Sequence, residues 1–216
     1  MLTSYSSARH MGHVCLGSTS PQPQARADRS SDFADQNPDI QVTGTDISPI
    51  QPGWTPPNLK LCVSPHLSNL PNPLSQLISD APTTSEIEDC TQEWTFPPNS
   101  ADYIHMRWLA GSIPDWNALF AEAYRTCKPG GWVESFEPSP HLESDHGPVP
   151  EDSAVGQWGR FFTEGGEKTG RTFSVVDDDL QRKGMEAAGF VDIGEFSFKV
   201  STGASREGVC ERERPR

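Results

Sequence analysis

The sequence has little of what several protein classes require. No apolar run approaches the roughly 18 residues that a transmembrane helix needs, and the first residues lack the apolar core of a secretory signal. The 5 cysteines are scattered and form no Cys-x-x-Cys pair, which predicts a reducing compartment and no structural zinc. We therefore expect an intracellular protein of the cytoplasm or nucleus, with no membrane partner.

Positive charge is also scarce. Against 30 aspartate and glutamate residues stand 17 lysine and arginine residues, so the formal net charge is −13. A protein that binds nucleic acid through its phosphates needs a positive surface, and an anionic membrane repels an acidic one. The charge therefore excludes a general nucleic-acid binder and predicts no nucleic-acid partner.

Apolar residues make up only 34% of the chain, whereas its 20 prolines are about twice the average usage. Residues 1–30 have no helical or strand period, so they are predicted to be disordered, as is the charged tail 201–216. One α/β domain is expected over residues 31–200. His10 and His13 lack a carboxylate or thiolate to complete a metal site, and no metal is predicted.

The most orderly stretch is residues 101–138. Residues 101–106 form a short apolar run that predicts a strand. Asp115 is expected to cap a helix that begins near Trp116. The positions that recur at spacings of three and four, as one buried helical face requires, are Trp116, Leu119, Phe120, Ala123 and Tyr124.

The second half of this stretch predicts the end of the helix and another strand. Glu122 and Arg125 are three residues apart and are expected to pair on the solvent side. Proline and glycine at 129–131 end the helix, and residues 132–137 read as a strand. Two strands joined through a helix favour a right-handed parallel crossover.

A third strand is expected at residues 40–45, with Asp46 at its carboxyl end. Nucleotide-binding α/β folds place a carboxylate there because it accepts two hydrogen bonds from the ribose diol. An aspartate that merely starts the turn before Ser48 and Pro49 is an equally good interpretation of the isolated pattern.

Several unusual strings occur together and in order. Residues 42–58 contain SPIQP, residues 86–139 contain WTFP and KPGG, and residues 177–193 follow as a helix and strand. These segments resemble the fungal type of S-adenosylmethionine-dependent methyltransferase, which is related to regulators of secondary metabolism. The resemblance implies a Rossmann-like α/β fold, S-adenosylmethionine as cofactor, and a small molecule or protein as methyl acceptor.

The resemblance also implies roles for particular residues. Asp46 would bind the ribose of the cofactor, and Ile47 would pack against the adenine. Asp89, with the backbone of Cys90, would contact the adenine amino group.

Further implied contacts follow the strand at residues 101–106. His105 and Arg107 would face the methionine moiety or the acceptor, together with Trp108. His105 is the weak candidate for a catalytic base, although a hydrogen-bonded structural histidine fits as well. Glu134 and Glu137 are alternatives, and each also fits a polar strand face.

Three departures from the family pattern support a different interpretation. Before Ser31 there is no hydrophobic strand that leads into a Gly-rich loop. Residues 13–17 are the nearest apolar segment and contain a single glycine, so the first strand is expected to be missing. Residues 61–85 read as an unstructured insertion. The last strand is also expected to be missing. The alternative is therefore an inactive methyltransferase remnant, either a partner-binding module or the product of a mis-predicted gene model.

The resemblance implies that residues 141–172 cover the acceptor site, as this region does in the family. A helix is predicted over 156–167 with Trp158, Phe161 and Phe162 on one face. A clearer helix is predicted over 177–188 and ends at Gly189. Its inward positions are expected to be Leu180, Gly184, Ala187 and Ala188.

Two further segments in the C-terminal half have predictions of their own. Residues 190–200 are predicted to form an amphipathic strand. The polar group at 141–146 reads as a flexible loop rather than a metal site. A nicotinamide dehydrogenase on the same fold is disfavoured, because its glycine fingerprint is equally absent.

Overall fold

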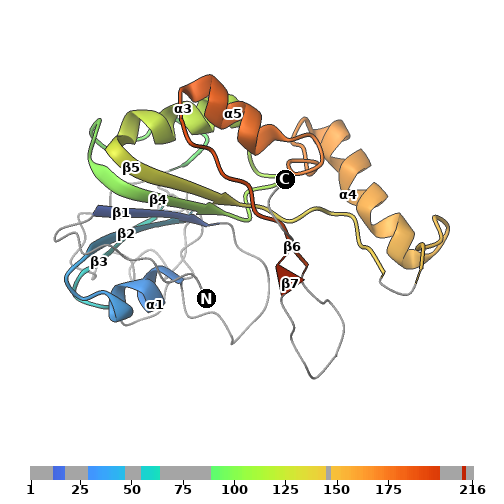
Figure 1. Cartoon of the computed structure of the whole chain (residues 1–216), viewed down its shortest axis with the longest axis horizontal. Coiled ribbons are helices and arrows are strands. Elements are labelled where there is room, and N and C mark those ends of the chain that lie inside the picture. Colours follow the sequence, from blue (N-terminus) through green and yellow to red (C-terminus); the bar gives the residue numbers. More distant parts are fainter. Residues whose placement is uncertain are drawn as a thin grey trace, which may run out of the picture.

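The structure, a computed structural model, describes residues 12–17, 29–46, 55–63, 89–144, 147–199 and 211–212. Its elements in chain order are β1 (Gly12–Gly17), α1 (Arg29–Gln36), β2 (Gln41–Asp46), β3 (Leu59–Val63), β4 (Ala101–Arg107), α3 (Trp116–Thr126), β5 (Cys127–Phe136), α4 (Ala154–Thr169), α5 (Leu180–Ala188), β6 (Phe198–Lys199) and β7 (Glu211–Arg212). Figure 1 shows their arrangement.

Five strands form one parallel sheet in the order β3-β2-β1-β4-β5. The first strand of the chain lies in the middle, and the order runs outward from it in both directions, as in doubly wound α/β folds. The Rossmann-like fold class expected from the sequence is confirmed. A separate antiparallel pair joins β6 to β7.

β1 occupies the central position of the sheet, which corrects one expectation. It pairs in parallel with β2 on one side and with β4 on the other. The prediction that the first strand is missing was therefore wrong. It took a Gly-rich loop as the mark of this strand, but strand pairing uses backbone groups that every residue except proline carries in full.

Helices cover both faces of the sheet (Figure 1). α3 and α5 lie together on one face, and α1 lies on the other. The core beneath α3 contains Ile104, Met106, Leu119 and Phe120, all at most 2% exposed. Sheet and helices thus form the layers that a Rossmann-like domain requires.

α3 follows its sequence prediction closely. The Asp115 side chain accepts a hydrogen bond from the Ala118 N–H at 3.1 Å, which satisfies one of the free donors of the first turn. Trp116 and Ala123 are buried as expected, together with the core residues of the same face. Tyr124 is not, because it is 49% exposed and lies edge-on against Phe190 at the margin of the helix.

The KPGG string lies inside β5 rather than before it. α3 ends at Thr126, and β5 pairs with β4 from Cys127 onward, with a register shift between Ala101 and Tyr103. Gly130 has a φ of +80°, which glycine adopts without strain. The string therefore forms an irregularity of the strand, and Lys128 anchors it through an ion pair with Asp102 at 2.7 Å.

Glu122 and Arg125 pair at 2.8 Å, as predicted, but they do more than face solvent. Arg125 donates to the carbonyls of Trp94 and Phe96, and Glu122 accepts from the Trp94 N–H. Burial alone would raise the pKa of Glu122. The hydrogen bonds from Arg125 and Trp94, with the charge of Arg125, outweigh burial, so the pKa is lowered. The pair therefore fastens the segment before β4 to α3.

A second, smaller core lies between α1 and the outer strands. Ala34, Val42 and Leu59 are its buried members. Beside them the Asn58 side chain, 7% exposed, donates to the carbonyls of Ala34, Asn37 and Ile40 at 2.8–3.0 Å. Asn58 thus joins the end of α1 to the start of β3.

The C-terminal third departs further from expectation. α4 is confirmed, but its aromatic face is open, with Phe161 74% exposed. α5 is confirmed from Leu180 onward and ends before Gly189, whose φ is +101°, although residues 177–179 form a turn and Ala187 is exposed. The strand predicted over 190–200 was wrong, since within residues 190–199, the described part of this range, only Phe198–Lys199 is a strand.

Some predictions concern residues outside the described ranges. These are Ile47, most of the N-terminal 30 residues, the charged tail except 211–212, and residues 64–85 of the expected insertion. Residues 61–63, which were included in that insertion, belong to β3.

Gly184 provides a test of the α3–α5 packing. A Cβ atom at Gly184 would lie 2.4 Å from the Phe120 ring. We expect Gly184→Ala to lower the free energy of unfolding by about 1–2 kcal/mol, because overpacking outweighs the helix propensity that alanine adds. Urea unfolding followed by circular dichroism measures this.

The matched control is Gly165→Ala in α4, where a Cβ atom meets nothing within 4 Å. There alanine should leave stability unchanged or raise it by up to about 1 kcal/mol. Equal effects of the two substitutions would contradict the packing described for α5.

Candidate cofactor and acceptor site at the carboxyl edge of the sheet

The five parallel strands end at a common edge. Register pairs Gly17 with Arg107, Asp46 with Val63, and Arg107 with Phe136. The strand order reverses at β1, which lies between β2 and β4. In open α/β sheets ligands bind outside the carboxyl ends of the strands at such a switch point. The candidate site therefore lies beyond Gly17 and Arg107.

Asp46 is the last residue of β2, so its backbone lies at this edge, where the sequence predicted it. Its paired neighbour is the last residue of β3. Its role toward a ribose stays a prediction, as does the contact expected of Ile47.

Asp89 and Cys90 lie in the segment that precedes β4. Asp89 Oδ1 accepts from the N–H and the hydroxyl of Thr91, at 2.9 and 2.7 Å. Among the described residues, no hydrogen bond to Oδ2 is present. The Cys90 carbonyl accepts a hydrogen bond from the Trp94 indole at 3.3 Å, and Cys90 forms no disulfide within the described residues. A fixed carboxylate with one open oxygen is suited to bind an amino group.

His105 lies on β4, directly beside Glu134 of β5. Its Nδ1 is 2.9 Å from Glu134 Oε2, and the Tyr103 hydroxyl donates to the same oxygen. The three side chains form a polar group on the sheet face opposite Ile104 and Met106. His105 thus has the hydrogen-bond partner of a structural histidine, and its use as a base stays a prediction.

The chain leaves β4 through a strained turn. Trp108 has a φ of +58°, a left-handed conformation that is uncommon for a bulky side chain. The Arg107 guanidinium lies over the Trp108 ring at 5.8 Å and over the Phe136 ring at 5.7 Å. Such strain persists only where the surroundings hold the backbone in place.

Glu137, which follows β5 directly, holds this turn in place. Leu109 N–H donates to both of its carboxylate oxygens and Ala110 N–H donates to Oε2, each at 2.9 Å. Burial raises the pKa of Glu137 from 4.5 to about 7, against the opposing effect of these hydrogen bonds and of the Arg107 charge. The sequence predicts Glu137 only as an alternative base or a polar strand residue, because no local signal connects it to a loop 28 residues earlier.

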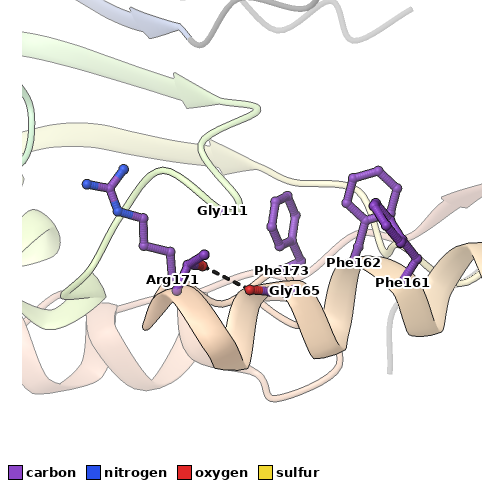
Figure 2. A pocket seen from close by; sticks show the side chains of 7 residues that line it. Gly111, Phe161, Phe162, Gly165, Arg171 and Phe173 are labelled. Carbon is purple, nitrogen blue, oxygen red and sulfur yellow. Dashed lines mark hydrogen bonds between the residues drawn. The ribbon is translucent and has the colours of Figure 1, made fainter.

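The loop that Glu137 holds continues into a groove against α4. Gly111 has a φ of +76°, its N–H donates to the Thr172 carbonyl at 2.8 Å, and it lies against the Phe173 ring. Figure 2 shows Gly111 facing Phe173, with Phe161 and Phe162 beside it. The expected acceptor region and the carboxyl edge therefore meet at this loop.

Within the described ranges, no helix is both long and apolar enough to cross a bilayer. No group of three or more histidine, cysteine, aspartate or glutamate side chains there is placed to hold a metal ion.

Comparison with known proteins identifies the family. The profile of the methyltransferase domain matches residues 30–193. The chain belongs to this family. The resemblance found in residues 42–58, 86–139 and 177–193 is thereby confirmed, and the edge beyond Gly17 and Arg107 is the candidate site of a methyltransferase domain.

Individual relatives agree with this membership. Methyltransferase pytC of Aspergillus terreus is 30% identical over 163 residues, which cover 76% of this chain and 42% of pytC. Secondary metabolism regulator LAE1 of Cochliobolus heterostrophus is 29% identical over 170 residues, 78% of this chain and 47% of LAE1. The chain thus spans less than half the length of these curated relatives.

Among solved structures, phosphoethanolamine N-methyltransferase 2 of Haemonchus contortus, in complex with phosphomonomethylethanolamine and S-adenosylhomocysteine, is similar with a TM-score of 0.48. The two sequences are 18% identical, and the match covers 88% of this chain and 35% of the phosphoethanolamine N-methyltransferase chain.

The pKa of Glu137 makes a testable contribution to stability. Between pH 4.5 and about 7 the folded protein holds a proton that the unfolded chain has released, so stability should fall as pH rises through this window. Glu137→Gln removes the titrating carboxyl, and with it this pH-dependent part of the stability, but keeps an acceptor oxygen. We expect the variant to gain stability relative to the natural protein across the window, on the order of 3 kcal/mol.

Urea unfolding at pH 4.5, 5.5, 6.5 and 7.5 checks this. Glu151→Gln, which removes an exposed carboxylate, controls for the change in net charge. A difference between Glu137→Gln and the natural protein that does not vary with pH would contradict the assignment.

Proposed function

We propose that the chain binds S-adenosylmethionine at the carboxyl edge of the sheet and transfers its methyl group to a small molecule or a protein. Membership of the methyltransferase domain family supports this. The observation that carries it is the alignment of five parallel strand ends around a switch point between β1 and β4. An involvement in secondary metabolism is part of the proposal, as is an intracellular location in the cytoplasm or nucleus.

The residues at the edge fit the cofactor. Asp46 would accept hydrogen bonds from the ribose diol, and Asp89 would use Oδ2 for the adenine amino group. Ile47 and the backbone of Cys90 would complete the adenine site, and Arg107 would border the methionine moiety. When bound, S-adenosylmethionine supplies an electrophilic methyl group on a sulfonium sulfur.

Methyl transfer of this kind mainly requires that the acceptor atom and the methyl group be held in line. Glu137 contributes by fixing the loop after β4. A base is needed only for an acceptor that must lose a proton. His105 suits that role chemically, since an Nδ1–H donated to Glu134 leaves the Nε2 lone pair free.

The rival proposal is a non-catalytic module that binds a partner. The observation that favours it lies in the sequence, because no glycine occurs between Gly17 and Asp28, where a cofactor-binding loop would follow β1. Both proposals require a folded domain, so they differ in cofactor binding alone.

Calorimetric titration with S-adenosylhomocysteine, together with a thermal melt, tests the proposal. We expect binding in the micromolar range and a raised melting temperature. Asp46→Ala should weaken binding about tenfold or more, because it removes the acceptor for the ribose hydroxyls.

Asp39→Ala is the matched control, since Asp39 precedes the amino end of the same strand and is exposed. This control should bind normally. No binding by the natural protein, with a sharp cooperative melt, would favour the non-catalytic module.

A further inference from the structure

An open apolar groove lies where α4 meets the loop after β4. The groove has a volume of about 490 Å³ and is lined by Gly111, Phe161, Phe162, Gly165, Thr169, Arg171 and Phe173. This volume falls within the range of small-molecule sites in proteins, roughly 300–1,000 Å³. Figure 2 shows the Arg171 side chain on one side of Gly111 and the rings of Phe161 and Phe162 on the other.

Two glycines shape the groove. A Cβ atom at Gly111 would lie 2.1 Å from the Phe173 ring, so the loop can approach this ring only without a side chain. Gly165 faces open space, with no other atom within 4 Å of a Cβ built there. The Thr169 hydroxyl is directed back to the Gly165 carbonyl at 3.0 Å, which leaves the wall largely apolar.

Aromatic rings form the other wall. Phe162 lies between Phe161 and Phe173, with ring centroids 5.4 and 5.1 Å away. Phe161 is 74% exposed, and Trp158, one turn earlier, is 52% exposed. Clustered aromatic exposure of this kind marks binding surfaces, because flat ligands can stack on or meet the edges of the rings.

Arg171 gives the groove a charge preference. It is exposed, and among the described residues its guanidinium forms no ion pair, although the chain carries 30 acidic residues. A guanidinium presents a planar fork of donors that matches a carboxylate. A cation beside apolar rings selects a molecule that combines an apolar flat body with one negative group.

We propose that this groove binds the methyl acceptor and that the acceptor is a small aromatic carboxylic acid. Its ring system lies against Phe161, Phe162 and Phe173, and its carboxylate is bound by Arg171. The inference rests on the proposed function, because Gly111 belongs to the loop that Glu137 fixes at the carboxyl edge. It assigns binding and orientation, and Arg171 is a specificity residue rather than a catalytic one.

The test uses 1-naphthoate as probe and 1-naphthylmethanol as its neutral counterpart in calorimetric titrations. We expect the natural protein to bind 1-naphthoate at least tenfold more tightly than the alcohol. Arg171→Gln should abolish this preference, since a charge-assisted hydrogen bond is typically worth a factor of about ten or more. Phe162→Ala should weaken both ligands.

Arg160→Gln is the matched control, because Arg160 is an exposed arginine of α4 that pairs with Glu164 outside the groove. It should leave both affinities unchanged. A thermal melt checks that each variant is folded, and Arg171→Gln is decisive because it alters an exposed side chain.

Equal affinity for the acid and the alcohol, or equal losses in Arg160→Gln and Arg171→Gln, would overturn the proposal. So would concentration-dependent dimerisation in analytical ultracentrifugation that Phe161→Ser abolishes, since a second copy would then occupy the groove. S-adenosylhomocysteine is titrated into the same variants. Arg171→Gln should bind it normally, so failure of the groove and failure of the cofactor site are distinguishable.

Discussion

The parallel pairing of β1 with both of its neighbours is the interaction on which the rest of the structure depends. The described chain contains two hydrophobic clusters that share no residue. One lies beneath α3 and α5, and the other lies between α1, β2 and β3. β1 joins the strands of one cluster to those of the other. Without it, β2 and β4 would each present an unpaired edge, and neither half would hold the other in register.

That register also creates the site. Because Gly17 pairs with Arg107 and Arg107 with Phe136, the chain leaves three neighbouring strands at one level. The left-handed Trp108 then turns the chain over the edge, and Glu137 binds the next two backbone N–H groups. The loop continues to Gly111, where the groove against α4 begins. The carboxyl edge of the sheet and the groove against α4 are thus parts of one continuous backbone path.

The sequence predicted those elements whose signals are local. α3 shows its apolar period and its Asp115 cap within a dozen positions, and both were correct except that Tyr124 is exposed. β4 and β2 were placed within one residue at either end. The residues that resemble the family pattern identified the family, and the comparisons confirmed it.

The failures involve contacts between distant residues. The prediction excluded β1 because the segment that follows it lacks glycines. In the structure β1 lies between β2 and β4 and pairs with the backbone of both, and its own sequence does not show these partners. The contact of Glu137 with the loop and the strained Trp108 turn could not be predicted, because the hydrogen bonds of Glu137 join segments 27 and 28 residues apart. Residues 190–197 have the alternation of a strand but lie outside the sheet order of the structure, so pattern alone misplaced them.

Hydrogen exchange of the backbone amides in residues 12–17, followed by mass spectrometry, tests the central claim most directly. If β1 bridges the two halves of the sheet, its amides should exchange as slowly as those of β4 and only through global unfolding. Addition of S-adenosylhomocysteine should slow the exchange of both strands together. Exchange in residues 12–17 at the rate of an unfolded peptide, while β4 stays protected, would contradict the account.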